Sequence, residues 1–277
     1  MHRFYVPNIE FPNSGALGTD VSGIKPTKHA MSLGGPVARQ LKTVLRAEIG
    51  DRIRLFDGSG SEWEVQIDGL DKDEVSTTLI STVEPVPEPS IKVTMLLGLA
   101  RSERIELAIQ KCTELGAVRF VLVMSERVQG GATGTPSANR LERWRRIAIE
   151  AAEQSGRATV PAVDAPLPIV DAVNQQLADQ PVLGMWEEQS SSSSSLNEAL
   201  KAIKSPKPQK ADASDMPGLS KLSALIGPPG GFSVREAKAI QSAGAHLVTL
   251  GPRVLRSETA AIAVMTAILY EMGDLGG

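Results

Sequence analysis

The stretch LSALIGPPGG, residues 222–231, ends an apolar run in a turn of glycine and proline. Ser233 and Glu236 follow with the spacing of a capping box, which opens a helix. A second stretch repeats this plan, because the apolar run 246–250 leads into Gly251-Pro252 and then into another apolar segment. Strand, tight turn and helix in succession indicate an α/β fold.

Outward from these two stretches, apolar runs alternate with segments of helical periodicity. The further strands are expected at 91–99, 120–124 and 181–186, and the helices at 102–115, 137–155, 233–242 and 258–272. Apolar residues at i, i+3, i+4 and i+7 support the helix at 102–115. Five strands alternating with helices predict a mainly parallel sheet.

The first third of the chain has a different pattern. Short alternating runs at 52–56, 62–67 and 75–83, separated by glycine turns, predict a small barrel or curled sheet, with a helix at 36–46 before them. Three alternating prolines at 84–89 mark a boundary. We therefore expect two domains, 1–86 and 90–277, with a loop at 12–28 and flexible surface insertions at 190–195 and 204–218 around a short helix.

The composition excludes several classes of protein. With one cysteine and three scattered histidines among 277 residues, a disulfide framework or a cysteine- or histidine-ligated metal site is not expected. No apolar run approaches 18 residues, and the N-terminus lacks the apolar stretch of a signal peptide. The expectation is a soluble cytoplasmic protein without a metal.

The net charge of −3 hides two basic blocks. Residues 1–56 carry eight Lys/Arg against four Asp/Glu, and residues 101–146 carry nine against five. Such asymmetry favours a local anionic partner, although a solvated surface explains it equally well.

The two glycine turns are the strongest candidates for a binding site. In open α/β sheets, ligands bind outside the carboxyl ends of strands, and glycine lets the backbone approach them closely. Neither a dinucleotide fingerprint, nor a triphosphate loop, nor a hydrolase nucleophile elbow occurs in the chain. Arg253, Arg256 and Glu258 lie at the start of the last helix, and Arg127 follows the strand 120–124 at the same end of the sheet.

These stretches resemble the RsmE family of SPOUT-class RNA methyltransferases, which methylate N3 of a uridine in 16S ribosomal RNA. The matching segments span nearly the whole chain, from Arg3-Phe4-Tyr5 through 109–116 and 144–157 to 225–232 and the sequence LGPRVLRSET at 250–259. The resemblance implies an N-terminal PUA-like β-barrel for RNA and a C-terminal SPOUT α/β domain with a trefoil knot. It also implies S-adenosylmethionine as the methyl donor, the small ribosomal subunit as partner, and a homodimer.

The resemblance assigns the cofactor to three loops. The expected cofactor-binding residues are Leu183, Gly184, Met185, Ile226, Gly227, Pro228, Gly230, Gly231, Leu250, Gly251, Val254, Leu255 and Thr259. For catalysis we expect Arg127 and Arg256 to stabilise the negative charge left on the uracil carbonyl oxygens, and Glu258 to act as the base. The basic blocks supply the expected RNA contacts, Arg3, Arg46, Arg140, Arg143 and Arg146.

One departure from the family pattern leaves alternatives open. The family usually has glutamate where this chain has Pro229, so that carboxylate is not available. Two alternatives remain. The first is an RNA-binding protein with the same fold but no catalytic activity, and the second is an α/β enzyme that binds another adenosine ligand.

Overall fold

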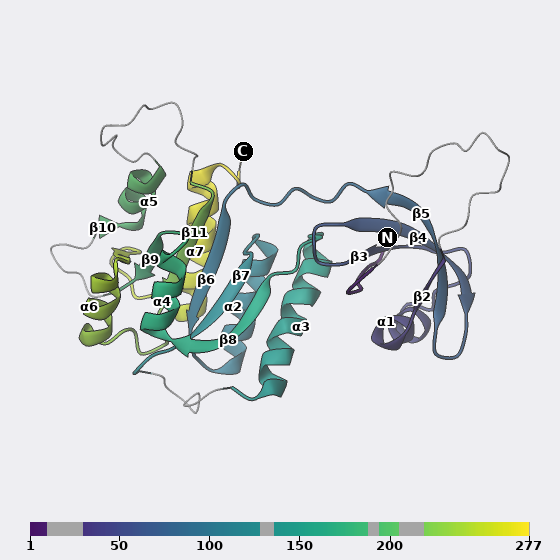
Figure 1. Cartoon of the computed structure of the whole chain (residues 1–277), viewed down its shortest axis with the longest axis horizontal. Helices are drawn as coiled ribbons and strands as arrows, with labels where there is room; N and C mark the ends of the chain where they lie inside the picture. The colour runs from purple at the N-terminus through teal and green to yellow at the C-terminus, as the bar shows by residue number, and fades with distance from the viewer. Residues whose placement is uncertain (10–29, 128–135, 188–193, 205–218, 277) are drawn as a thin grey trace. The chain divides into compact units, whose positions relative to one another are not determined.

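The structure, a computed structural model, describes residues 1–9, 30–127, 136–187, 194–204 and 219–276. These residues form two compact units, Met1–Pro87 with Ala152–Val160, and Glu88–Ala151 with Pro161–Gly277. The expected loop at 12–28 and most of both expected insertions lie outside the described residues. Figure 1 shows the elements of each unit.

The first unit is a five-stranded curled sheet with one short helical segment. Its strands are β1 (Arg3–Tyr5), β2 (Ala30–Leu33), β3 (Arg52–Phe56), β4 (Glu62–Leu70) and β5 (Val75–Val83), and helix α1 (Gly35–Arg39) continues as a π-helix, Gln40–Val44. The strand order is β1-β3-β4-β5-β2, with β1 parallel to β3 and the other pairs antiparallel. Alternate residues of these strands, among them Leu55, Val65 and Ile67, are completely buried and pack with Leu41 of the π-helix.

A segment from the second half of the chain completes this unit. Phe56 packs with Ala152 and Ala158, and Gly58 pairs with Thr159 in an isolated bridge. Residues 152–160 therefore belong with the first unit, whereas the expected boundaries 1–86 and 90–277 placed them with the second.

The second unit is a seven-stranded sheet in which every pair of neighbouring strands is parallel. Its strands are β6 (Lys92–Gly98), β7 (Arg119–Met124), β8 (Ala162–Pro168), β9 (Val182–Met185), β10 (Ser194–Ser195), β11 (Lys221–Ile226) and β12 (His246–Thr249). Their order is β10-β12-β9-β11-β6-β7-β8. The chain thus fills one half of the sheet from β6 outward to β8 and then builds the other half on the opposite side of β6.

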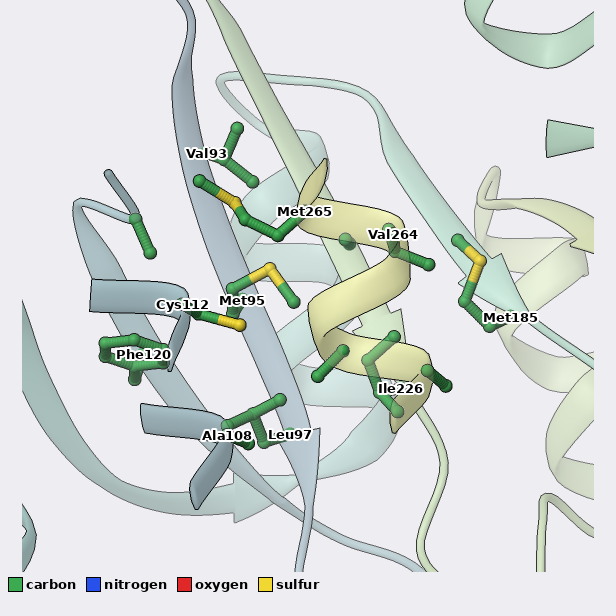
Figure 2. Close-up of a cluster of buried hydrophobic side chains, with 14 of the residues drawn as sticks. Val93, Met95, Leu97, Ala108, Cys112, Phe120, Met185, Ile226, Val264 and Met265 are labelled. Carbon is green, nitrogen blue, oxygen red and sulfur yellow. The ribbon is translucent and has the colours of Figure 1, made fainter. Parts of the chain in front are cut away.

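Helices cover both faces of this sheet. They are α2 (Ser102–Glu114), α3 (Ala138–Ser155), α4 (Ile169–Leu177), α5 (Leu196–Lys204), α6 (Val234–Ala243) and α7 (Ser257–Met272). Alternate residues of the central strands join two separate apolar clusters, as Met95 and Leu97 pack with α2 and α7 while Leu96 packs with α4 and α6. Figure 2 shows the first cluster, with the side chains of Met95 and Met265 gathered around β6 and α7.

In the first unit, β1 and β2 were not expected. In the second unit, the expected α/β class and all five expected strands are confirmed, and three of its described elements were not expected. They are β8, α4 and β10. Strand β10 is built from the last two serines of the serine run, which pair with Val248 and Thr249, so this part of the expected flexible insertion is an edge strand. The trefoil knot stays a prediction.

Candidate functional site

A cavity of about 230 Å³ lies at the carboxyl ends of three adjacent strands, β9, β11 and β12. The last residue of each strand and the segment after it contribute to the lining: Met185 to Glu187, Ile226 to Gly231 without Gly230, and Thr249 to Ser257 without Pro252. Arg104 of α2 and Ala260 of α7 complete the lining. This is the edge at which ligands bind in open α/β sheets.

Nine of the thirteen expected cofactor residues line this cavity. They are Met185, Ile226, Gly227, Pro228, Gly231, Leu250, Gly251, Val254 and Leu255. The others lie elsewhere: Leu183 and Gly184 are buried inside β9, Gly230 is part of the loop but not of the lining, and Thr259 is an exposed residue of α7. A Cβ at Gly184 would lie 2.9 Å from Cδ2 of Leu247, so this glycine serves the packing of the sheet.

Close approach explains the glycines of the loop after β11. A Cβ at Gly98, at the end of β6, would lie 2.7 Å from the carbonyl carbon of Gly227, so two strand ends meet here without room for a side chain. Gly231 has φ +67°, and a Cβ there would collide with the carboxylate of Glu187. The loop therefore requires glycine for both conformation and space.

Directly after this loop, hydrogen bonds cap α6 and join its first turn to the segment after β7. Ser233 and Glu236 form the expected capping box, with the Glu236 backbone N–H donating to Ser233 Oγ over 3.0 Å. The second carboxylate oxygen of Glu236 accepts from the backbone N–H of Glu126 at 2.8 Å. Hydrogen bonds from Arg235 and Ser233 hold the pKa of Glu126 below its ordinary value.

Arg127 reaches the loop but does not line the cavity. Its guanidinium lies 3.5 Å from the carbonyl oxygen of Gly230, and the residue is exposed. The structure thus brings Arg127 next to the glycine loop after β11, at the end of the sheet where it was expected, and gives it a contact with the backbone.

Glu258 lies behind the cavity wall. It is 9% exposed and lines a second, smaller pocket with Gly98, Gly227 and Ile105. Its carboxylate is 3.8 Å from Nε of Arg104 and accepts a hydrogen bond of 3.2 Å from Ser257 Oγ. The expected base is therefore a buried, paired carboxylate in the first turn of α7.

The cavity lining contains four charged side chains, three positive and one negative. Arg104, Arg253 and Arg256 contribute three guanidinium groups, and Glu187 contributes the one carboxylate found in the lining among the described residues. Sequence reasoning missed Arg104 and Glu187. Glu187 directly follows the strand 181–186, so the rule that ligands bind at the carboxyl ends of strands could have identified it. Arg104 lies in a helix, and no local sequence pattern marks it as a binding residue.

Chemically, the cavity combines apolar walls with clustered positive charge. Ile226, Leu250 and Leu255 suit the flat face of a base, and guanidinium groups suit a phosphate or a developing anion. Among the described residues, no group of histidine, cysteine and carboxylate side chains is placed to hold a metal ion.

Of the expected RNA contacts, Arg46, Arg140 and Arg146 are exposed. Arg46 has φ +52°, a conformation uncommon outside glycine, two residues after the end of the π-helix. Arg143 is also exposed but forms an ion pair of 2.8 Å with Glu106, and its guanidinium holds the pKa of Glu106 below the ordinary value although partial burial opposes this shift.

Arg3 has a structural role instead. Its guanidinium is bound by both oxygens of Glu62, at 3.1 and 2.8 Å, and donates to the carbonyl oxygens of Ala152 and Glu153. It also lies 4.8 Å from the ring centre of Phe56. The side chain of Arg3 is only 12% exposed and its guanidinium already has these partners, so it is not available to a phosphate. This corrects the expectation that Arg3 contacts RNA.

No helix in the described part of the chain is long and apolar enough to cross a membrane.

Comparison with known proteins identifies the family. A family model described as an RNA methyltransferase domain matches residues 87–269, and one described as an RNA methyltransferase PUA domain matches residues 34–80. The ribosomal RNA small subunit methyltransferase E of Synechocystis is 34% identical over 83% of this chain and 70% of its own length. The protein of the same name from Bacillus subtilis is 31% identical over 89% of this chain and 92% of its own length.

Solved structures agree with this result. A ribosomal RNA small subunit methyltransferase E from Neisseria gonorrhoeae, bound to S-adenosylmethionine, superimposes with a TM-score of 0.76 at 27% identity, covering 98% of this chain and 97% of that one. A methyltransferase from Legionella pneumophila in complex with the same cofactor gives a TM-score of 0.75 at 25% identity, covering 97% and 96%. With a family model spanning residues 87–269 and curated relatives matched along most of its length, the chain belongs to the RsmE family of RNA methyltransferases.

Proposed function

We propose that this protein methylates the ribosomal RNA of the small ribosomal subunit with S-adenosylmethionine as methyl donor, and that its target is N3 of a uridine in 16S ribosomal RNA. Support comes from the names of the curated relatives and from the cofactor in two related structures. The choice of N3 rests on the family resemblance.

The observation that carries the proposal is the cavity at the carboxyl ends of β9, β11 and β12. Its residues fit the cofactor, because the glycine loops expose backbone groups and the apolar walls suit an adenine ring. In addition, the indole Nε1 of Trp186 is buried beside the cavity and has no acceptor among the described residues. We assign cofactor binding to the nine expected residues that line the cavity, together with Trp186.

The cofactor supplies an electrophilic methyl group, and the protein must prepare the nitrogen that receives it. Loss of the N3 proton leaves negative charge on the neighbouring carbonyl oxygens of the uracil ring. We assign the stabilisation of this charge to Arg256, which is exposed at the cavity, and Arg104 and Arg253 line the same space. N3 lies on the pairing edge, so the target base has to be unpaired or flipped out.

We assign RNA binding to Arg46 in the first unit and to Arg140, Arg143 and Arg146 on α3. Replacing Arg140 or Arg146 with alanine should weaken RNA binding and reduce the slope of log K against log salt by about 0.7 for each lost phosphate contact. An unchanged slope would show that these arginines are only a solvated face.

We also propose a homodimer. On α7, Ile262, Ala263 and Ala267 remain only half-buried although the helix already packs on the sheet, and Val254 before it is 79% exposed. A helix that is apolar on several sides needs further cover, and a second copy of the chain provides it by two-fold symmetry. Sedimentation of the active protein should give twice the chain mass of 29.4 kDa, and an active monomer would refute the dimer.

The direct test is methyl transfer onto small ribosomal subunits that lack the modification, followed by mass spectrometry of the nucleosides. Appearance of 3-methyluridine is expected. Binding of the subunits without transfer would favour the alternative of an RNA-binding protein. Absence of S-adenosylmethionine binding in calorimetry would favour an enzyme for another adenosine ligand.

A further inference from the structure

The carboxylate of Glu187 differs from every other acidic group near the cavity. It belongs to the lining, its residue is exposed, and no hydrogen bond or ion pair engages it within the described residues. Glu258, the nearest alternative, is absent from the lining and is engaged by Arg104 and Ser257. A carboxylate that is paired and walled off is a poor proton acceptor for a base in the cavity.

The backbone sets the position of Glu187. The residue follows β9 directly after Trp186, and its carboxylate lies against Gly231, where any Cβ would collide with it. The space left by this glycine is therefore the space that the carboxylate occupies. Three guanidinium groups, of Arg104, Arg253 and Arg256, line the same cavity from α2 and from the segment between β12 and α7.

We propose that Glu187 is the catalytic base of the reaction, an inference that rests on the proposed function. Its carboxylate takes the proton of the uracil N3–H, the electron pair of that bond stays on nitrogen, and the resulting anion is the nucleophile. As N3 bonds to the methyl carbon, the bond from that carbon to the sulfonium sulfur of the donor breaks, its electron pair stays on sulfur, and the thioether S-adenosylhomocysteine leaves. The proton then leaves Glu187 to water. The arginines that line the cavity stabilise the anion, and Glu258 positions Arg104 from behind the wall.

A second role for such a carboxylate would be to bind hydroxyl or ammonium groups of the cofactor. The two roles predict different measurements. A base contributes to the rate and leaves cofactor affinity alone, whereas a cofactor contact contributes to affinity.

The experiment compares the full-length protein with its Glu187→Gln variant on small ribosomal subunits that lack the modification. Loss of the base should lower kcat by about 10²- to 10⁴-fold. The Kd for S-adenosylmethionine, measured by calorimetry, should stay within about twofold. Glu103→Gln, which removes an exposed carboxylate of α2 outside the cavity lining, is the matched control and should change neither value.

A second substrate isolates the proton transfer. Fluorine at C5 makes the N3–H of uridine more acidic, so subunits reconstituted with 5-fluorouridine-containing RNA depend less on a base. The ratio of wild-type to Glu187→Gln rates should therefore be smaller on the fluorinated substrate than on the natural one.

The outcomes are distinct. An unchanged rate in Glu187→Gln, or a loss of rate that follows weaker cofactor binding and is not relieved by fluorine, overturns the assignment of the base. Failure of the wild-type protein to methylate the subunits overturns the proposed function itself. A rate loss with intact cofactor affinity and partial relief by fluorine supports Glu187.

Discussion

Two features of Gly231 favour glycine at this position. Its backbone is left-handed, and the carboxylate of Glu187 occupies the place where a Cβ would lie. Gly231→Ala should strain the loop whose backbone groups we assign to cofactor binding, so we expect cofactor affinity to fall by about tenfold or more, or about 1.4 kcal/mol. Calorimetry with S-adenosylmethionine measures this change. Gly50→Ala is the matched control, because Gly50 has φ +101° but nothing within 4 Å of its Cβ position. It should cost stability and leave the affinity unchanged; equal losses of affinity in both variants would contradict the steric account.

The ion pair of Arg3 and Glu62 should be a main support of the first unit. Its side chains are 12% and 2% exposed, so removal of one partner leaves a buried charge. We expect Arg3→Ala to cost about 3 kcal/mol in urea unfolding, partly reduced by Arg54 at 3.5 Å from Glu62. The exposed pair Arg52–Glu64 serves for comparison, and Arg52→Ala should cost about 0–1 kcal/mol. Similar costs for the two variants would show that burial does not decide the contribution.

Cys112 should be chemically silent in the folded protein. Burial raises the pKa of its thiol to about 12, so the reactive thiolate is almost absent at pH 8. A thiol reagent at pH 8 should leave the native protein unlabelled and label it fully in denaturant. Rapid labelling under native conditions would mean that the core between β6 and α2 opens readily.

The sequence predicted the position of the loops at the site better than the pairing of its charged side chains. Gly227 and Gly251 stand where an apolar run ends, so their place in a loop at the sheet edge follows from local sequence. The partnership of Arg104 with Glu258 joins residues 154 positions apart and becomes visible only when α2 and α7 lie side by side. For the same reason Glu258 looked like an available base and is a buried one.

At the scale of elements, α6 is held by its cap. Ser233→Ala removes the hydroxyl that accepts from Glu236 and donates to Glu126. The expected loss is about 1 kcal/mol in urea unfolding. Ser242→Ala changes an exposed position in the last turn of the same helix. It should cost no stability, because alanine has a higher helix propensity than serine. If both variants unfold alike, the cap contributes nothing measurable.

A continuous apolar pattern made β6 predictable, whereas two prolines argued against β8. The continuous apolar run of β6 predicted a strand buried on both faces. Strand β8 contains Pro166 and Pro168, which argue against a strand, yet it lies at the edge of the sheet, where proline is tolerated. Whether a strand is at an edge depends on the arrangement of the whole sheet and cannot be read from its own residues.

In the second unit as a whole, Asp274 links the last residues of the unit to its first residues, Ser90 and Ile91. Its carboxylate accepts from the backbone and hydroxyl of Ser90 and from the backbone of Ile91. Although partial burial opposes the shift, these bonds hold the pKa of Asp274 below its ordinary value of 3.8. The stabilisation is therefore present above pH 3.8 and is lost as the pH falls below that value.

The test compares wild type with Asp274→Asn in thermal unfolding. We expect the variant to have the lower Tm at pH 7 and the difference to shrink as the pH falls toward 3. A difference that stays constant with pH would show that the negative charge of Asp274 does not matter.

The path of the chain between the two units has a consequence for its synthesis. The segment Ala152–Val160 completes the first unit, although 64 residues of the second unit, Glu88–Ala151, precede it in the sequence. A nascent chain emerges from its N-terminus, so the curled sheet waits for Ala152 and Ala158 to cover Phe56, and Arg3 waits for its two carbonyl partners. Translation therefore completes the first unit only at residue 160, after the first 64 residues of the second unit have been made. A gene fragment that stops at residue 87 encodes every strand of the sheet and still leaves its fold unfinished.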